Sequence, residues 1–218
     1  MNSDTTPVLL TDEAFTQGLQ DLCEKDPDLA QIYTRLDPPT LWARKPGFAS
    51  LVYIILEQQV SLASAKATYD RLQAGITQVS PERFLKLDDA SLKTIGFSRQ
   101  KTTYCRNLAG AIVHGDLDLN GLEGLDDVTA RSELTRIKGI GSWTANIYLL
   151  TALRRPDIWP KEDLALAVAV QEVKGLTARP SPKELDAHGA CWKPWRSVAA
   201  RLLWNYYRGK NPPRPGKK

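Results

Sequence analysis

Apolar residues recur at helical spacing along most of the chain. In residues 11–26 three of them fall on one helical face, with Thr11 and Asp12 as candidate N-terminal caps. Residues 37–47, "DPPTLWARKPG", break the pattern and are predicted to form a connection. Residues 48–75 follow as one long helix or a pair of helices. Their first part is apolar nearly all round, which predicts a central place in the core.

Two later segments share the layout of helix, tight turn and helix. In residues 88–115 the interruption falls at Gly96 and Ser98, and in residues 127–155 it falls at "KGIGS", residues 138–142. Further helices are predicted over 80–87, 181–190 and 192–209.

The stretch "LALAVAV", within residues 164–176, alternates large and small side chains with period two, a pattern typical of strands. Pro160, the acidic residues that precede the stretch and the helical neighbours favour a helix. The whole chain is therefore predicted to be all-α.

Composition narrows the class of protein. With 218 residues, 42% of them hydrophobic and 25% charged, the chain is long enough for one or two ordinary globular domains. No apolar run reaches the length of a membrane span, and the first residues lack the layout of a secretory signal. We therefore expect a protein of the cytoplasm, or of the nucleus in a eukaryote, that is not secreted and has no membrane partner.

Cysteine and histidine are too few and too scattered for several kinds of site. Cys23, Cys105 and Cys191 lie far apart, and His114 and His188 form no metal-binding motif. This spacing argues against zinc, iron–sulfur and Ser-His-Asp chemistry, so no metal site is predicted. Any catalysis must use mainly carboxylates, lysines or aromatic residues.

Charge is unevenly distributed around a net value of +4. Residues 1–30 contain seven acids and one lysine, whereas the 32 residues after Asp186 contain eight bases and no acid. Tryptophan and tyrosine are interleaved with these bases, a combination that suits DNA. A solvated helix face with a frayed tail explains the same pattern equally well.

The turn "KGIGS" has a physical interpretation of its own. Gly139 and Gly141 permit positive φ and a close approach of the backbone, so their amides and those of the next helix can face an anion such as a DNA phosphate. Lys138 adds a positive charge, and Thr144 adds a hydroxyl donor. Tight turns between helices also use glycine for geometry alone, so the spacing by itself leaves both interpretations open.

Four motifs in order resemble the helix-hairpin-helix DNA glycosylase superfamily. They are "ILEQQVS", "IGFSRQKTTYCRNLA", "LTRIKGIGSWTANIYLL" and "WKPWRSVAARLLW", within about residues 40–207. They resemble its alkylpurine branch, the 3-methyladenine DNA glycosylase II type. The resemblance implies the compact form without an amino-terminal β domain: a single unit over 1–218, with two helical subdomains flanking an active-site cleft. The hairpin is expected at about 131–153 and a flexible tail at about 209–218.

The resemblance also implies roles for individual residues. Trp143 occupies the position of the Schiff-base lysine of bifunctional members, which implies a base pocket and no lyase activity. Asp163 matches the catalytic aspartate, where a carboxylate stabilises the positive charge that develops on the sugar. The neighbouring Glu162 is the other candidate, and either acid could instead serve only the helix dipole. Lys161 departs from the acidic or small residues expected there.

Two further groups of residues are carried over in the same way. Gln59, with Gln58 beside it, matches the wedge that fills the gap left by an extruded base, although both amides could simply cap a helix end. Trp204 matches a pocket aromatic. Ile147 stands where the best-known member has a pocket tyrosine, which leaves the selectivity open. Trp192 and Trp195 are expected to anchor the last helix in the core.

The resulting hypothesis is a monofunctional glycosylase that excises alkylated purines such as 3-methyladenine and 7-methylguanine and leaves an abasic site. Its expected partner is double-stranded DNA with damaged bases, bound by a monomer through the hairpin amides, Lys138 and the basic carboxy-terminal helix. No organic cofactor is implied, and family analogy allows a monovalent cation on hairpin carbonyls. The alternatives are a glycosylase for deaminated or oxidised bases and a non-catalytic module that binds lesions.

Overall fold

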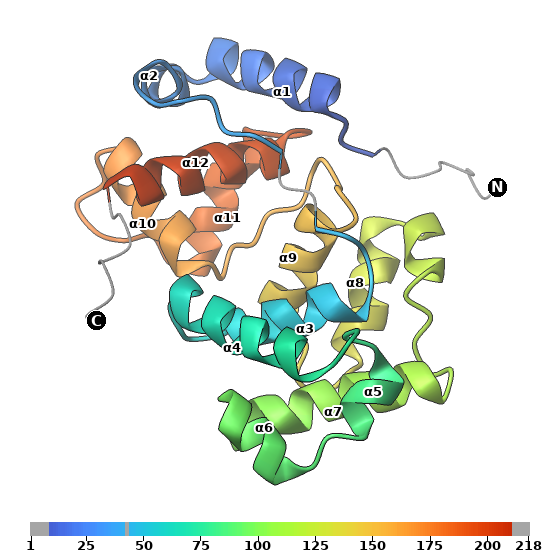
Figure 1. The fold of residues 1–218 in the computed structure, drawn as a ribbon. Coiled ribbons are helices and arrows are strands. Elements are labelled where there is room, and N and C mark those ends of the chain that lie inside the picture. The colour runs from blue at the N-terminus through green and yellow to red at the C-terminus, as the bar shows by residue number, and fades with distance from the viewer. Residues whose placement is uncertain (1–8, 42–43, 211–218) are drawn as a thin grey trace, which may run out of the picture. The chain divides into compact units, whose positions relative to one another are not determined.

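The computed structural model describes residues 9–41 and 44–210, and this part of the chain is all-helical (Figure 1). It contains twelve α-helices and one 3-10 helix, and none of the described residues forms a strand. The chain divides into two compact units, which consist, among the described residues, of 44–153 and of 9–41 with 154–210. The prediction of an all-α fold is confirmed.

The first unit is built around the apolar helix α3, Phe48–Glu57. Leu51, Val52, Ile54 and Ile55 of this helix are fully buried, as its sequence predicted. The helices of this unit that follow are α4 Leu62–Gly75, α5 Pro81–Leu85, α6 Asp89–Ile95, α7 Arg99–Val113, the 3-10 helix Gly121–Gly124, α8 Asp127–Thr135 and α9 Ser142–Thr151.

Two hydrogen bonds join the residues just before α3 to helix α9. The hydroxyl of Tyr148, on α9, accepts a 2.8 Å hydrogen bond from the amide of Gly47, immediately before α3. Burial raises the pKa of Tyr148 to about 12. The amide of Arg44 donates to the carbonyl of Thr151 at 3.0 Å. The hairpin helix α9 is therefore fixed against the central helix.

The second unit contains α1 Asp12–Lys25, α2 Pro27–Arg35, α10 Leu164–Val173, α11 Pro182–Ala190 and α12 Arg196–Lys210. Helix α1 begins after Thr11, whose hydroxyl accepts from the amide of Ala14, as predicted. Helix α10 confirms the helical interpretation of residues 164–176. Burial against α12 selected the helix over the strand that period two suggested.

Residues 48–75 form a pair of helices, one of the two predicted alternatives, because Ser61 caps α4 after a break at residues 58–61. Other boundaries differ from those predicted. Helix α2 was not anticipated, and it begins because the Asp26 side chain accepts from two amides of its first turn. Helix α12 starts at Arg196 rather than at residue 192, and it ends at Lys210, close to the position at which the tail is expected to begin. The remaining residues of that tail, 211–218, lie outside the described residues.

No helix among the described residues is both long and apolar enough to cross a membrane.

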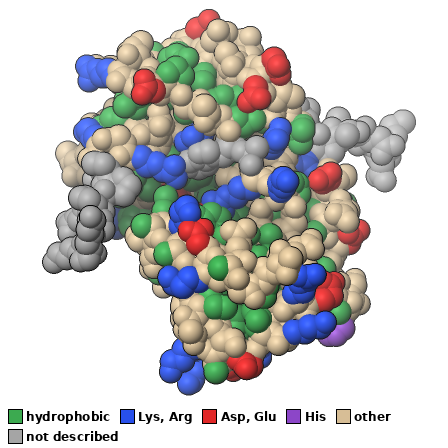
Figure 2. Space-filling model, in the orientation of Figure 1, with side chains coloured by type: hydrophobic (Ala, Val, Ile, Leu, Met, Phe, Trp, Pro, Cys, Tyr) green, Lys and Arg blue, Asp and Glu red, His purple; other side chains and the backbone are tan. Residues whose placement is uncertain are grey.

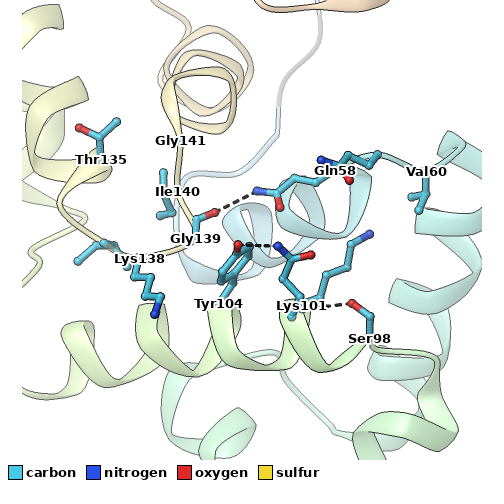
Figure 3. Close-up of a pocket in the computed structure, with 13 residues that line it drawn as sticks. Gln58, Val60, Ser98, Lys101, Tyr104, Thr135, Lys138, Gly139, Ile140 and Gly141 are labelled. Carbon is cyan, nitrogen blue, oxygen red and sulfur yellow. Dashed lines mark hydrogen bonds between the residues drawn. The ribbon is translucent and has the colours of Figure 1, made fainter.

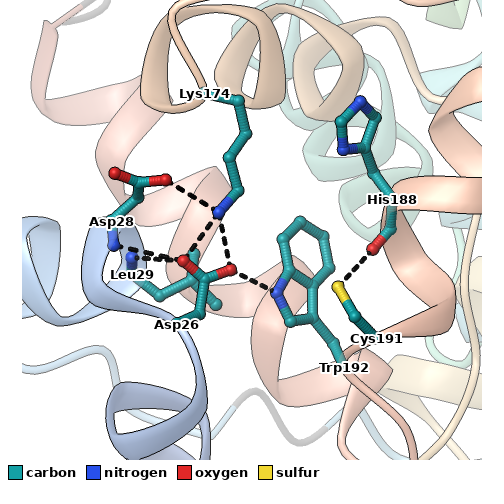
Figure 4. Close-up of polar contacts among 7 residues, drawn as sticks. All are labelled: Asp26, Asp28, Leu29, Lys174, His188, Cys191 and Trp192. Carbon is teal, nitrogen blue, oxygen red and sulfur yellow. Dashed lines mark hydrogen bonds and ion pairs between the residues drawn. The ribbon is translucent and has the colours of Figure 1, made fainter.

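A buried polar cluster holds together the junction of α1 and α2, the end of α10 and the turn between α11 and α12 (Figure 4). The carboxylate of Asp26 accepts hydrogen bonds from Lys174 Nζ at 2.6 and 2.7 Å and from Trp192 Nε1 at 2.7 Å. Asp28 accepts from the same ammonium at 2.9 Å. Burial opposes ionisation of Asp26, but the hydrogen bonds from Lys174 and Trp192 outweigh it and lower the pKa of Asp26.

Replacing Asp26 with asparagine should lower the free energy of unfolding by about 1–3 kcal/mol at neutral pH. Asp28 still partners Lys174 in this variant, which limits the loss. Because the pKa of Asp26 is lowered on folding, its contribution is complete above 3.8 and is lost as the pH falls through the folded-state value. Urea unfolding at pH 7 and at about pH 3 measures this. Equal stabilities at pH 7, or a difference that persists undiminished at pH 3, would contradict it.

Candidate nucleic-acid interface and catalytic carboxylate

Helices α8 and α9 form the predicted hairpin, joined by residues 136–141. A partly buried hydrogen bond of 2.7 Å from Arg131 Nε to Asn146 Oδ1 joins the two helices, and Asn146 is only 4% exposed. This contact fixes the angle at which the connecting turn leaves α8 and enters α9.

The two glycines of the turn have different tasks. Gly139 has φ of +111°, and a β-carbon there would lie 2.3 Å from the Tyr104 ring, so only glycine fits. Gly141 has φ of −89°, and a β-carbon there would meet nothing within 4 Å. The expectation of positive φ is therefore correct for Gly139 and wrong for Gly141, which adopts an extended conformation open to any residue.

Hydrogen bonds to the turn carbonyls determine where its amides point. Asn107 Nδ2 donates to the carbonyl of Lys138 at 3.2 Å. Because a trans peptide points its C=O and its N–H in opposite directions, the amide of Gly139 points away from α7. At the start of α9, Gly141 supplies no side-chain cap to the first-turn amides. The turn thus presents backbone donors and the positive end of a helix dipole on one side, which suits an anion.

A groove of about 560 Å³ runs alongside this turn (Figure 3). The turn between α3 and α4, the start of α7 and the hairpin turn line it together. The lining side chains are mostly polar and include Gln58, Gln59, Gln100, Lys101, Tyr104 and Lys138. Lys138 is exposed at its rim, as a phosphate contact requires.

Gln58 and Thr144 form a hydrogen bond with each other. Gln58 Nε2 donates to the Gly139 carbonyl at 3.0 Å and to Thr144 Oγ1 at 2.9 Å. Thr144 is 2% exposed, so its hydroxyl belongs to the interior of the hairpin. Both side chains thus make hydrogen bonds within the protein, and DNA contact by Gln58 and Thr144 stays a prediction. Gln59, by contrast, is exposed and has φ of +57°.

The groove also contains residues that sequence reasoning did not single out. Lys101 Nζ donates to the carbonyl of Leu56 near the end of α3, and burial lowers the pKa of Lys101. Gln100 Nε2 donates to the hydroxyl of Tyr104 at 2.7 Å. Both donors, with Tyr104 and Asn107, belong to the motif "IGFSRQKTTYCRNLA". That motif was the only available signal, and it did not say which of its side chains meet the hairpin.

Four carbonyls of the hairpin turn accept hydrogen bonds from donors within the protein. The amide of Ile140 donates to the Ile137 carbonyl, and the amide of Ala145 donates to the Gly141 carbonyl. Asn107 Nδ2 donates to the Lys138 carbonyl, and Gln58 Nε2 donates to the Gly139 carbonyl. Each of these carbonyls is therefore oriented by a donor within the protein.

In the second unit, Asp163 and Trp204 lie in direct contact. Asp163 is the N-cap of α10, and its Oδ1 accepts from the Leu166 amide at 2.8 Å and from Trp204 Nε1 at 3.0 Å. Asp163 is partly buried and Trp204 is 6% exposed, whereas Glu162 is exposed. The structure thus gives Asp163 the helix-capping role that its position suggested and adds an indole partner that the sequence did not reveal.

The loop that carries Asp163 is firmly anchored to α12. Arg196 forms an ion pair with Asp157 through Nε at 2.8 Å, and Ser197 Oγ accepts from the Ile158 amide at 2.9 Å. The same hydroxyl donates to the Arg155 carbonyl at 2.6 Å. Lys161 forms an ion pair of 3.3 Å with Asp186 of α11. A loop held by this many contacts can keep a carboxylate in a fixed orientation.

The remaining tryptophans and Ile147 have distinct environments. Trp143, in the first turn of α9, is partly exposed rather than a core residue, and Ile147 follows one turn later with 5% exposure. Trp192 is 1% exposed, which confirms its place in the core. Trp195 is partly buried, and its indole donates to Asp21 Oδ2 at 2.7 Å against α1.

Three basic residues of the carboxy-terminal helix form ion pairs or hydrogen bonds within the protein. Arg196 pairs with Asp157, Lys210 pairs with Glu172 at 3.0 Å, and Arg201 donates to the Thr40 carbonyl at 2.8 Å. Burial, with a smaller effect of a neighbouring arginine, lowers the pKa of Arg201 to about 10. On the face shown in Figure 2, Lys and Arg side chains are spread widely over the surface. The contacts of Arg196, Lys210 and Arg201 given above all lie within the second unit, which they stabilise.

The all-helical fold and the helix-hairpin-helix turn agree with the superfamily that the sequence motifs resemble. Residues 52–196 match the HhH-GPD superfamily of base excision DNA repair proteins, and the chain belongs to that superfamily.

The chain is also similar to individual members. It is 29% identical over 169 residues to a DNA-3-methyladenine glycosylase of Bacillus subtilis, an alignment that covers 72% of this chain and 56% of that protein. The crystal structure of a DNA-3-methyladenine glycosidase from Bacillus halodurans matches with a TM-score of 0.74 and 31% identity, over 87% of this chain and 88% of that one.

A Schizosaccharomyces pombe 3-methyladenine DNA glycosylase in complex with abasic DNA shares the fold, with a TM-score of 0.79 and 24% identity, over 93% of this chain and 99% of that one. The chain spans 56% and 55% of the length of the two Bacillus subtilis relatives that it matches.

Substitution of each hairpin glycine by alanine should separate their tasks. Gly139→Ala should lower the free energy of unfolding by about 2–4 kcal/mol, because it combines positive φ with overlap against the Tyr104 ring. Gly141→Ala should change it by less than about 0.5 kcal/mol. Denaturant unfolding of both variants measures this. If Gly141→Ala were as unstable as Gly139→Ala, the conclusion that a β-carbon at residue 141 meets no neighbouring atom would be wrong.

Proposed function

We propose that this protein is a monofunctional DNA glycosylase that excises alkylated purines, of the 3-methyladenine and 7-methylguanine class, from double-stranded DNA. The observation that carries the proposal is Asp163, a carboxylate on an anchored loop that Trp204 orients at 3.0 Å. The glycosylase names of the Bacillus relatives support it. Such an enzyme acts as a monomer wherever genomic DNA lies, in the bacterial cytoplasm or in a eukaryotic nucleus.

Binding in this proposal begins with the DNA backbone. A phosphate accepts from the outward amide of Gly139 and from the start of α9, and Lys138 adds a charge. Gln59, exposed on its turn, fills the gap that an extruded nucleotide leaves in the stack. These contacts recognise the backbone and the deformed duplex rather than a sequence.

The base and the sugar then meet different residues. In the first unit, the indole of Trp143 and the side chain of Ile147 contact the flipped base in this proposal, and in the second unit the indole of Trp204 has that role. As the bond between the sugar C1′ and the base nitrogen lengthens, its electron pair leaves with the base, and positive charge builds on the sugar. The carboxylate of Asp163 stabilises that charge and orients a water whose oxygen bonds to C1′, releasing a proton to solvent.

An alkylated purine that carries a positive charge leaves as a neutral molecule, so no strong general acid is needed. Trp143 has no amine with which to attack C1′, and the product is an intact abasic strand rather than a strand break. Ile147, an aliphatic residue, offers less stacking than an aromatic one. A deaminated or oxidised base is therefore the second candidate substrate.

Replacement of Asp163 by asparagine should lower the single-turnover rate of base release by at least about 10²-fold. The matched Glu162→Gln variant removes the adjacent, exposed acid and should retain the wild-type rate. The measurement is free purine released from methylated DNA, with parallel panels carrying hypoxanthine or 8-oxoguanine.

Release from only one of those other panels would assign the second candidate substrate. Tight binding of methylated DNA without release of any base would make the protein a lesion-binding module. Strand cleavage without added alkali would show that the role given to Trp143 is wrong.

Replacement of Lys138 by alanine should weaken binding to duplexes of any sequence to a similar extent. Because one phosphate contact is lost, the slope of log Kd against log salt concentration should fall by about 1. Fluorescence anisotropy at several salt concentrations measures both quantities. An unchanged slope would remove Lys138 from the interface.

A further inference from the structure

One side chain connects two elements that the proposed function uses separately. The wedge turn, residues 58–61, joins α3 to α4, and its first residue, Gln58, donates to Gly139 and Thr144 in the hairpin. These partners are 81 and 86 residues away in the sequence. In Figure 3 the Gln58 side chain reaches across the groove to the backbone of Gly139.

The chemistry of this contact requires an amide. The carbonyl of Gly139 is an acceptor, and the Thr144 oxygen accepts as well, so both N–H donors of Gln58 are used. Thr144 is 2% exposed, where a lost partner is costly because water cannot replace it. A carboxylate of the same size would supply no donor at all.

The residue that follows Gln58 has a strained backbone conformation. Gln59 has φ of +57°, a left-handed conformation that costs a residue other than glycine about 1–2 kcal/mol. Its neighbours keep it there. The Gln58 amide donates to Ile55 at 3.3 Å, and Ser61 accepts from the Ser64 amide at 3.2 Å to begin α4. The Gln58 side chain links this turn to the hairpin through its two hydrogen bonds.

We propose that Gln58 is a positioning residue that couples capture of a phosphate by the hairpin to insertion of Gln59 into the duplex. This inference rests on the proposed function. The Gly139 carbonyl belongs to the same residue whose amide faces the phosphate, so the hydrogen bond sets the distance between the phosphate site and the wedge. Without it, the hairpin still binds the backbone, but the wedge enters the stack at an additional entropic cost.

The first test measures insertion directly and does not depend on the identity of the lesion. A duplex with a tetrahydrofuran abasic-site analogue carries 2-aminopurine as the unpaired partner base, whose fluorescence reports displacement by the wedge. At saturating protein, Gln58→Met should lower the equilibrium constant for insertion about tenfold. Its Kd for undamaged duplex should change less than twofold, because the hairpin amides remain.

Two further variants bracket this result. Gln59→Ala removes the wedge itself and should abolish the fluorescence change. Gln73→Met makes the same chemical change on the exposed face of α4 and should behave as wild type. If Gln58→Met loses affinity for undamaged duplex as strongly as it loses insertion, Gln58 has a general structural role and the coupling is wrong.

A second variant keeps the inference testable if Gln58→Met fails to fold. Thr144→Val removes one acceptor while preserving shape, and it should reduce insertion relative to wild type, by less than Gln58→Met where that variant folds. Wild-type insertion by Thr144→Val would contradict the inference. In a double-variant cycle, Thr144→Val should have no further effect once Gln58 is methionine. Additive effects would overturn the inference.

Gln58→Glu provides a chemical readout that a merely structural role would not give. Its ionised carboxylate faces the Gly139 carbonyl, whereas the protonated acid regains one donor. Because an ordinary glutamic acid has a pKa of about 4.3, insertion should be weak at about pH 8 and partly recovered at about pH 4.5, relative to wild type at each pH. A pH-independent defect would contradict the coupling. Wild-type protein that inserts normally but releases no base would overturn the proposed enzyme activity and leave the coupling intact.

Discussion

The candidate DNA interface depends on the contact between the Tyr104 ring and the backbone of Gly139. A β-carbon at residue 139 would lie 2.3 Å from that ring, so the hairpin turn can follow its path only with glycine there. Once the turn lies against α7, Asn107 and Gln58 reach its carbonyls, and the planarity of the peptide sends the Gly139 amide outward. The direction of the phosphate donors is therefore set by interior packing.

In the second unit, one carboxylate combines a structural and a chemical role. Asp163 caps α10 and accepts the indole N–H of Trp204, while Arg196 and Ser197 of α12 secure the loop before it. Helix capping, which competed with catalysis as an explanation of this residue, is compatible with it. A cap is held in one orientation, and a fixed orientation is what electrostatic stabilisation of a reacting sugar requires.

Several polar residues that the sequence places near DNA make their hydrogen bonds within the protein. Thr144, Gln58 and Arg201, which belongs to the basic carboxy-terminal helix, are examples. Their hydrogen-bond partners lie between 81 and 161 residues away in the sequence. Thr144 bonds to Gln58, Gln58 also bonds to Gly139, and Arg201 bonds to Thr40. Local patterns carry no information on such pairs, so the sequence could not show that these donors and acceptors are used inside the protein.

Helical periodicity, capping residues and glycine positions determined the all-α fold, most helix boundaries and the place of the hairpin, because these features depend on residues within a few positions of one another. The motifs identified the superfamily and pointed to Asp163, Trp204 and Gln59. Only the tertiary structure decided that Gln58 faces the hairpin, that Gly139 rather than Gly141 requires glycine, and that Trp204 meets Asp163. Those outcomes depend on side chains that become neighbours only when distant helices pack, and packing is a property of the whole chain.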